Sequence, residues 1–187
     1  MVKRLEIFET RRTFLRPFLL EDDIDLFELN ADLKVIQFTG DGPFSSKEEA
    51  RTFIREYSHY HKFGYGRWAA IRKEDLEFLG WCGLKFHPAT EETDLGFRFK
   101  QKFWNQGYAT ETAKACLQIG FNAYELPKII GRAAVENLAS VRVLEKIGMT
   151  YSHAIELSGM PASQYSMSKP MVEKHTFPES AVFSQAD

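Results

Sequence analysis

Cysteine is scarce in this sequence, the net charge is small, and no long hydrophobic run occurs. Cys82 and Cys116 fall in a predicted strand and a predicted helix without zinc-ligand spacing, so we expect buried, reduced thiols and no metal. The net charge of −2, with acids and bases interspersed, does not favour nucleic acid or a membrane surface as a partner. Without a transmembrane run or a secretory signal, we expect a cytoplasmic protein.

The length bounds the organisation of the chain. With 187 residues and 44% hydrophobic content, the chain can bury one substantial core. We expect a single domain over residues 1–187, with its core at about 10–172, as a monomer or homodimer. The polar tail at about 175–187 is expected to be poorly ordered.

The chain is organised around residues 94–149. Residues 95–99 predict an aromatic-rich strand, and residues 128–135 predict another. Between them, residues 108–124 carry apolar side chains at steps of three and four, which indicates an amphipathic helix that ends before Pro127. This order predicts a βαβ unit with two parallel strands and a right-handed crossover.

The loop before that helix carries the chemistry. Gly107 allows a tight turn, and the free N–H groups of the first helical turn, together with the helix dipole, favour an anion such as a pyrophosphate. The loop is neither a P-loop nor a three-glycine dinucleotide fingerprint. The alternative is an ordinary strand-to-helix turn.

Three motifs resemble the GCN5-related N-acetyltransferase (GNAT) superfamily, in particular its ribosomal-protein alanine N-acetyltransferase (RimJ/RimL-type) branch. They are Gly-Tyr-Ala-Thr-Glu-Thr-Ala at 107–113, Val-Glu-Asn-Leu-Ala-Ser at 135–140 and Leu-Glu-Lys-Ile-Gly-Met at 144–149. The resemblance implies an α/β (α+β) fold with a single mixed, mostly antiparallel central sheet. That sheet would contain a splayed parallel strand pair and the central βαβ unit, with helices on both faces.

The resemblance also implies an acetyl-CoA-dependent N-acetyltransferase, which passes an acetyl group directly to a primary amine of a protein N-terminus or a small molecule. The alternative is a non-catalytic acyl-CoA-binding or sensor module on the same fold. Backbone N–H groups of the fourth predicted strand would polarise the thioester carbonyl, the loop amides would hold the pyrophosphate, and Asn137 would meet the pantetheine arm. The implied cofactor-binding residues are Phe97, Arg98, Phe99, Trp104, Asn105, Gln106, Gly107, Tyr108, Ala109, Thr110 and Asn137.

The motifs leave alternatives open for the catalytic residues. Ser140 matches a serine that, in the ribosomal-protein branch, is placed to protonate the leaving thiolate; the alternative is an ordinary helix-surface serine. Many members of the superfamily carry a tyrosine at the position of Leu144, so Ser140 or water must act as the acid here. Asp94 could act as a base through water, or it could be a solvated acid at a strand end.

The acceptor side is predicted around residues 32–44, which we expect to be irregular, and a hairpin at 151–167. Phe38, Asp41, Phe44 and Trp68 would suit a primary amine on a less polar body, with the acid holding the ammonium. The alternative is that the aromatic residues are core and Asp41 is a turn residue. Ser46, with Glu49 three residues later, predicts a capping box at the start of a helix beside this loop.

Overall fold

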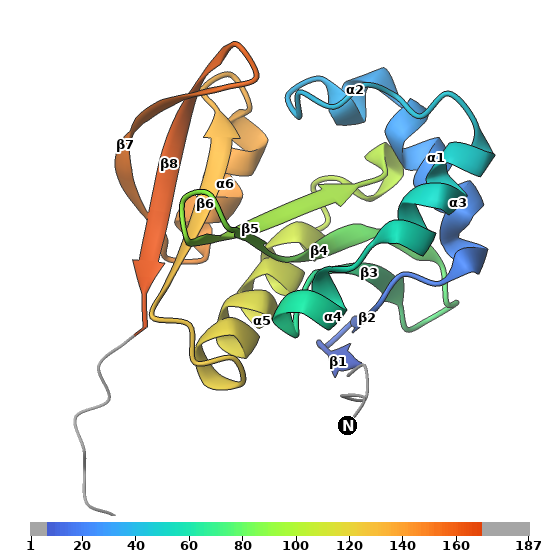
Figure 1. Cartoon of the computed structure of the whole chain (residues 1–187), viewed down its shortest axis with the longest axis horizontal. Coiled ribbons are helices and arrows are strands. Elements are labelled where there is room, and N and C mark those ends of the chain that lie inside the picture. The colour runs from blue at the N-terminus through green and yellow to red at the C-terminus, as the bar shows by residue number, and fades with distance from the viewer. Residues whose placement is uncertain (1–6, 170–187) are drawn as a thin grey trace, which may run out of the picture.

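The computed structural model describes residues 7–169 and shows one eight-stranded sheet in the order β1-β2-β3-β4-β5-β6-β8-β7 (Figure 1). Only β5 and β6 pair in parallel, and the other neighbours are antiparallel. The predicted tail at 175–187 lies outside the described residues. The strands are β1 Phe8–Glu9, β2 Thr13–Arg16, β3 Arg67–Arg72, β4 Phe78–His87, β5 Glu92–Phe99, β6 Lys128–Ala134, β7 Thr150–Leu157 and β8 Met160–Ser168.

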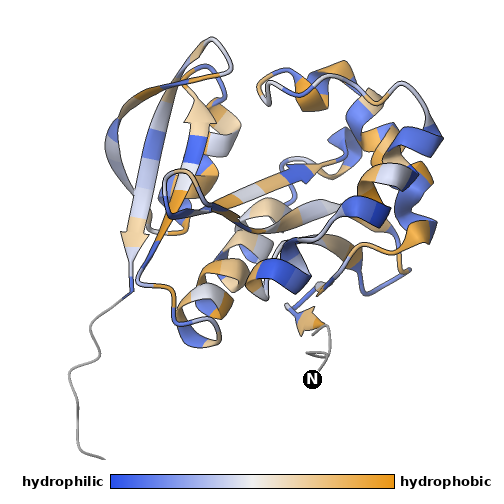
Figure 2. Cartoon of the chain, in the orientation of Figure 1, coloured by the Kyte–Doolittle hydropathy of each residue, from blue (hydrophilic) through white to orange (hydrophobic). Residues whose placement is uncertain are grey.

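Helices cover both faces of this sheet, as expected (Figure 1). On β3, Trp68 and Ala70 join the cluster that includes α5, whereas Ala69 and Ile71 join the cluster with α1 and α3, because side chains alternate along a strand. Hydrophobic and hydrophilic residues also alternate along these helices (Figure 2). The helices are η1 Leu20–Asp22, α1 Asp23–Ala31, α2 Leu33–Ile36, α3 Lys47–Glu56, α4 His59–Phe63, η2 Gln101–Phe103, α5 Tyr108–Asn122 and α6 Leu138–Lys146.

The parallel pair separates soon after it forms. Asp94 lies opposite Ile130 and Leu95 opposite Gly131, and no further pair joins β5 to β6. Residues 96–99 of β5 stay paired with β4 alone. The predicted βαβ unit and the splay of its two strands are therefore confirmed.

Some local expectations needed correction. The region predicted to be irregular contains α2, a single turn that Asp32 caps by accepting a hydrogen bond from the Lys34 backbone. The predicted capping box is half formed: the Ser46 hydroxyl accepts from the Glu49 N–H, but the Glu49 carboxylate accepts from Ser45 rather than from the Ser46 backbone. Among residues 7–169, no helix combines the length and apolar character needed to cross a membrane.

Candidate active site

The loop between β5 and α5 is held by its own side chains. The Trp104 indole donates a hydrogen bond to the Phe99 carbonyl at 2.7 Å, and the Gln106 amide donates to the Lys102 carbonyl at 2.7 Å. Gly107 caps α5 with a φ of 81°, a conformation that favours glycine. A side chain at Gly107 would meet only Arg12 Nη2, at 3.5 Å, so the space in front of the turn is open within the described chain.

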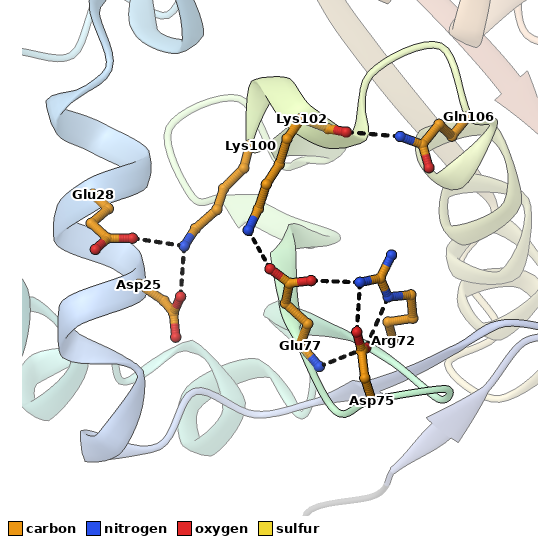
Figure 3. A network of polar contacts seen from close by, with 8 residues as sticks. All are labelled: Asp25, Glu28, Arg72, Asp75, Glu77, Lys100, Lys102 and Gln106. Carbon is orange, nitrogen blue, oxygen red and sulfur yellow. Dashed lines mark hydrogen bonds and ion pairs between the residues drawn. The ribbon is translucent and has the colours of Figure 1, made fainter.

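A polar network ties this loop to the rest of the molecule (Figure 3). Lys100 at the end of β5 donates to Asp25 at 2.6 Å and to Glu28 at 2.9 Å, both on α1. Lys102 pairs with Glu77, which also pairs with Arg72 of β3. The connection between β5 and α5 is therefore anchored to α1 and to the β3–β4 turn, which preorganises the loop.

Arg12 is a residue of this loop region that sequence reasoning missed. Its Nε donates to Glu111 Oε2 at 2.7 Å, and its guanidinium lies 4.2 Å from the centre of the Tyr108 ring. Burial opposes ionisation of Glu111, but hydrogen bonds from Thr10 and Arg12 outweigh it and lower the pKa of that carboxyl. The β1–β2 turn thus brings a guanidinium to the start of α5. No local signal around Arg12 indicates this contact.

Asn137 and Ser140 meet at the start of α6. Asn137 caps the helix, since its side-chain oxygen accepts from the Ser140 N–H at 3.1 Å. Within residues 7–169 the Ser140 hydroxyl has no protein hydrogen bond, so it is available to a ligand. Leu144, which stands where a tyrosine is common, is buried in the core.

Asp94 is a buried partner of Arg67. Arg67 Nη2 donates to both carboxylate oxygens, at 3.0 and 2.7 Å, and Nη1 donates to the Asp94 and Gly83 carbonyls. The guanidinium lies over Gly96, where an added side chain would come within 2.6 Å of it. Burial raises the pKa of Asp94, but the charge of Arg67 and its hydrogen bonds hold it well below its usual range. This argues against Asp94 as a base, because so acidic a carboxyl accepts a proton poorly near neutral pH.

The predicted acceptor residues do not form one group. Trp68 is 2% exposed and packs against Phe8 in the core cluster that includes α5. Phe44 packs against Phe53 of α3, and Phe38 is half-buried. Asp41 accepts a hydrogen bond from Arg98 at 2.5 Å, so its carboxylate already has a cationic partner.

Two further features of the described chain bear on the site. A shallow groove near the start of the β5–α5 connection contains no predicted site residue. The groove is lined by Glu28, Leu29, Asp32, Val35, Lys100, Gln101 and Lys102. Among residues 7–169, no group of three or more His, Cys, Asp or Glu residues is arranged to hold a metal ion.

Comparison with known proteins decides the family. Residues 12–150 match the acetyltransferase (GNAT) domain. The chain belongs to the GNAT acetyltransferase family. It is 33% identical over 166 residues to the uncharacterized protein YkkB of Bacillus subtilis, covering 87% of this chain and 90% of that protein. It is 30% identical over 161 residues to an FsC-acetyl coenzyme A-N(2)-transacetylase of Aspergillus fumigatus, covering 80% and 67%.

Solved structures agree with the fold of this GNAT chain. A GNAT-family acetyltransferase from Bacillus anthracis superposes with a TM-score of 0.76 at 25% identity, covering 88% of this chain and 99% of that one. RimL, a ribosomal-protein acetyltransferase in complex with coenzyme A, superposes with a TM-score of 0.73 at 19% identity, covering 87% and 98%. The second likeness shows the fold alone. The GNAT chain is accordingly an acyltransferase enzyme.

Proposed function

We propose that this GNAT enzyme transfers an acetyl group from acetyl-CoA directly to a primary amine. The observation that carries the proposal is the opening between β5 and β6, which lies between the Gly107 loop and the cap of α6. A single ligand with a pyrophosphate at one end and a thioester at the other fits this order of elements. Family relatives named as N-acetyltransferases support the same chemistry.

The proposed binding roles follow from the order of these elements. The backbone amides of residues 105–110 would hold the pyrophosphate, because they lie at the positive end of α5. Among Phe97, Arg98 and Phe99, the N–H groups that face away from β4 would polarise the thioester carbonyl, on the part of β5 that no longer pairs with β6. Preorganised donors of this kind stabilise developing oxyanion charge by about 2.7–4 kcal/mol. Asn137 would meet the pantetheine arm through its amide group, whose oxygen also caps α6.

Proton transfer needs one donor and one acceptor. The Ser140 hydroxyl would protonate the departing thiolate, since Leu144 offers no hydroxyl. Water would take the proton from the amine and return one to Ser140, because Arg67 stabilises the Asp94 carboxylate and makes it a poor proton acceptor. In this proposal Asp94 is a positioning residue, which keeps Arg67 flat over Gly96 next to the reacting part of β5.

The proposal also includes the class of amine acceptor and the cellular location of the enzyme. The Aspergillus relative is named as an N(2)-transacetylase of FsC, whereas RimL is named as an acetyltransferase of a ribosomal protein. A small-molecule amine and a protein N-terminus therefore both remain within the proposed acceptor class. We place the enzyme in the cytoplasm, since its two thiols lie 3.6 Å apart and are free.

Incubation with acetyl-CoA and a panel of primary amines tests the proposal. An active enzyme releases free CoA only when an acceptor is present, and mass spectrometry finds the acetylated amine. Binding of CoA by calorimetry without release across the whole panel would favour the sensor module instead. Absence of CoA binding would contradict both functions.

A further inference from the structure

Arg98 is a buried cation with an incomplete set of partners. It lies on β5 next to Phe97, and its side chain points to the α1 side of the sheet, 8% exposed. Nη1 donates to the Asn30 side-chain oxygen and Nη2 to Asp41 Oδ2. The third donor, Nε, is buried without a hydrogen-bond partner in residues 7–169. A buried unpaired donor is costly, so it marks a place where a further acceptor would fit.

The nearby Arg67 has more hydrogen-bond acceptors than Arg98, although its own Nε likewise has no partner among residues 7–169. Its guanidinium bonds to both oxygens of a carboxylate that is 13% exposed and to two backbone carbonyls. Arg98 has a single carboxylate, Asp41, which is 60% exposed. Gly40 and Gly42 flank Asp41 in a loop outside any helix or strand, so this partner can leave without disturbing the sheet.

We propose that Arg98 binds an anionic group of the acceptor, a carboxylate or a phosphate on the same molecule as the reacting amine. Asp41 occupies this place in the free enzyme and yields it to the acceptor. This inference rests on the proposed acetyl transfer. The planar guanidinium presents paired donors that match both kinds of anion, and Nε completes such a pair.

The position of Arg98 suits this role. It adjoins Phe97, whose backbone is proposed to contact the thioester, so an anion at the guanidinium lies within a few bonds' reach of the reacting amine. A cationic far end finds no such partner here, because the nearby carboxylate, Asp41, is already paired with Arg98. The acceptor class is therefore an amino acid, an acidic peptide or a phosphorylated amine rather than a polyamine.

Matched pairs of amines test this directly. The pairs are glycine with glycinamide, β-alanine with β-alaninamide, and O-phosphoethanolamine with ethanolamine, so the pairs separate carboxylate from phosphate recognition. We expect at least one anionic member to exceed its neutral partner by about 10-fold to 100-fold in kcat/KM, the range for a hydrogen-bonded charged group. Calorimetry on the CoA-bound enzyme should show the same order of affinities, which gives a readout independent of turnover.

Variants test whether Arg98 causes the preference for the anionic amine. Arg98→Gln, which keeps the backbone N–H group of this position, should remove the preference for the anionic member. Asp41→Asn should lower the KM for the anionic member by about twofold to fivefold, because it removes a competing ion pair whose carboxylate is 60% exposed. Chemical denaturation checks that this variant is folded, since it leaves the buried Arg98 without a carboxylate. Glu48→Gln is the matched control, since it removes an exposed carboxylate that pairs with Arg55 on α3.

Failure of the proposed acetyl transfer and failure of the proposed Arg98 site give different results. Loss of CoA binding in the unmodified enzyme contradicts the acetyl transfer itself. Equal kinetics and equal affinities within every pair overturn only the role of Arg98. A folded Arg98→Gln enzyme that keeps the preference, or an Asp41→Asn enzyme that behaves like Glu48→Gln, also overturns it.

Discussion

Arg67 and Arg98 lie against the same Trp81 ring, each with its guanidinium carbon 5.3 Å from the ring centre, yet their partners differ. Arg67 is paired within the sheet, whereas Arg98 reaches out to a loop. These ion pairs limit the chemistry of the two carboxylates. Arg67 stabilises the anionic form of Asp94, and Arg98 already provides a cationic partner for Asp41. The residues around Asp94 do not indicate its pairing with Arg67, which lies 27 residues earlier in the chain. The prediction of Asp94 as a base was therefore made without knowledge of this ion pair.

Removal of the buried carboxylate provides the first prediction. Asp94→Asn should lower the free energy of unfolding at pH 7 by about 3–5 kcal/mol, because it leaves the Arg67 charge buried without a counter-ion. Asp75→Asn is the control, since Asp75 pairs with Arg72 at an exposed position and should cost about 0–1 kcal/mol. Equal losses in chemical denaturation would show that the Asp94 pair is no stronger than a surface pair.

The same carboxylate predicts a pH dependence. The pKa of Asp94 is lower in the folded protein than its unfolded value of about 3.9, so the stabilisation is complete above about pH 5. It is lost as the pH falls below about 4. The difference in unfolding free energy between the unmodified protein and Asp94→Asn should therefore shrink between pH 5 and pH 3. A constant difference over this range would contradict the shift.

Ser140 provides a catalytic prediction. Ser140→Ala should lower kcat by about 10²-fold or less and leave the CoA affinity nearly unchanged, because it removes a proton donor used only in the transition state. The cap of α6 survives, since Asn137 bonds to the Ser140 backbone. Single-turnover kinetics is the measurement. An unchanged rate of the chemical step would assign protonation of the thiolate to water.

At the scale of elements, strong periodic patterns predicted the structure well. The 108–124 pattern gave α5 at Tyr108–Asn122, and the strands on both sides form the parallel pair. Short elements were missed, because β1 has two residues and α2 has one turn, too few to show a period. The loop before α5 was recognised from Gly107, but Arg12 reaches it from a different strand pair. A contact between distant segments leaves no local signal.

The loop itself can be tested with two glycines of nearly equal backbone geometry. Gly107 has a φ of 81° and Gly159, in the β7–β8 turn, a φ of 79°. Alanine at either position should cost about 1–2 kcal/mol of stability through backbone strain. Only Gly107→Ala should weaken CoA binding, by about tenfold or more, because its added methyl group enters the open space before the loop amides. Equal CoA affinities by calorimetry would contradict a pyrophosphate site at this loop.

At the scale of the whole molecule, the proposed ligand connects parts that the sheet alone leaves apart. Beyond Leu95 and Gly131, β5 and β6 share no backbone pairs, and each carries a helix at its far end. The family resemblance predicted this opening. The length and hydrophobic content of the chain predicted only that one substantial core could form. The sequence could not predict the ion pairs on the α1 side, because they join distant residues: Arg98 and Asp41 are 57 positions apart, and Lys100 and Asp25 are 75 apart.

A ligand that spans the opening should stabilise the molecule as a unit. At 100 times its dissociation constant, CoA should add about 2.7 kcal/mol to the free energy of unfolding, which for a chain of this size corresponds to a rise in Tm of about 5–10 °C. Hydrogen exchange should slow in both the first turn of α5 and the start of α6, because a pyrophosphate and a pantetheine arm would contact them together. Protection at α5 alone would indicate a phosphate site without the arm, and it would remove Asn137 and Ser140 from the proposed site. The Gly107→Ala protein should lose most of the Tm rise and the protection at both helices, since the arm depends on the anchor that the loop provides.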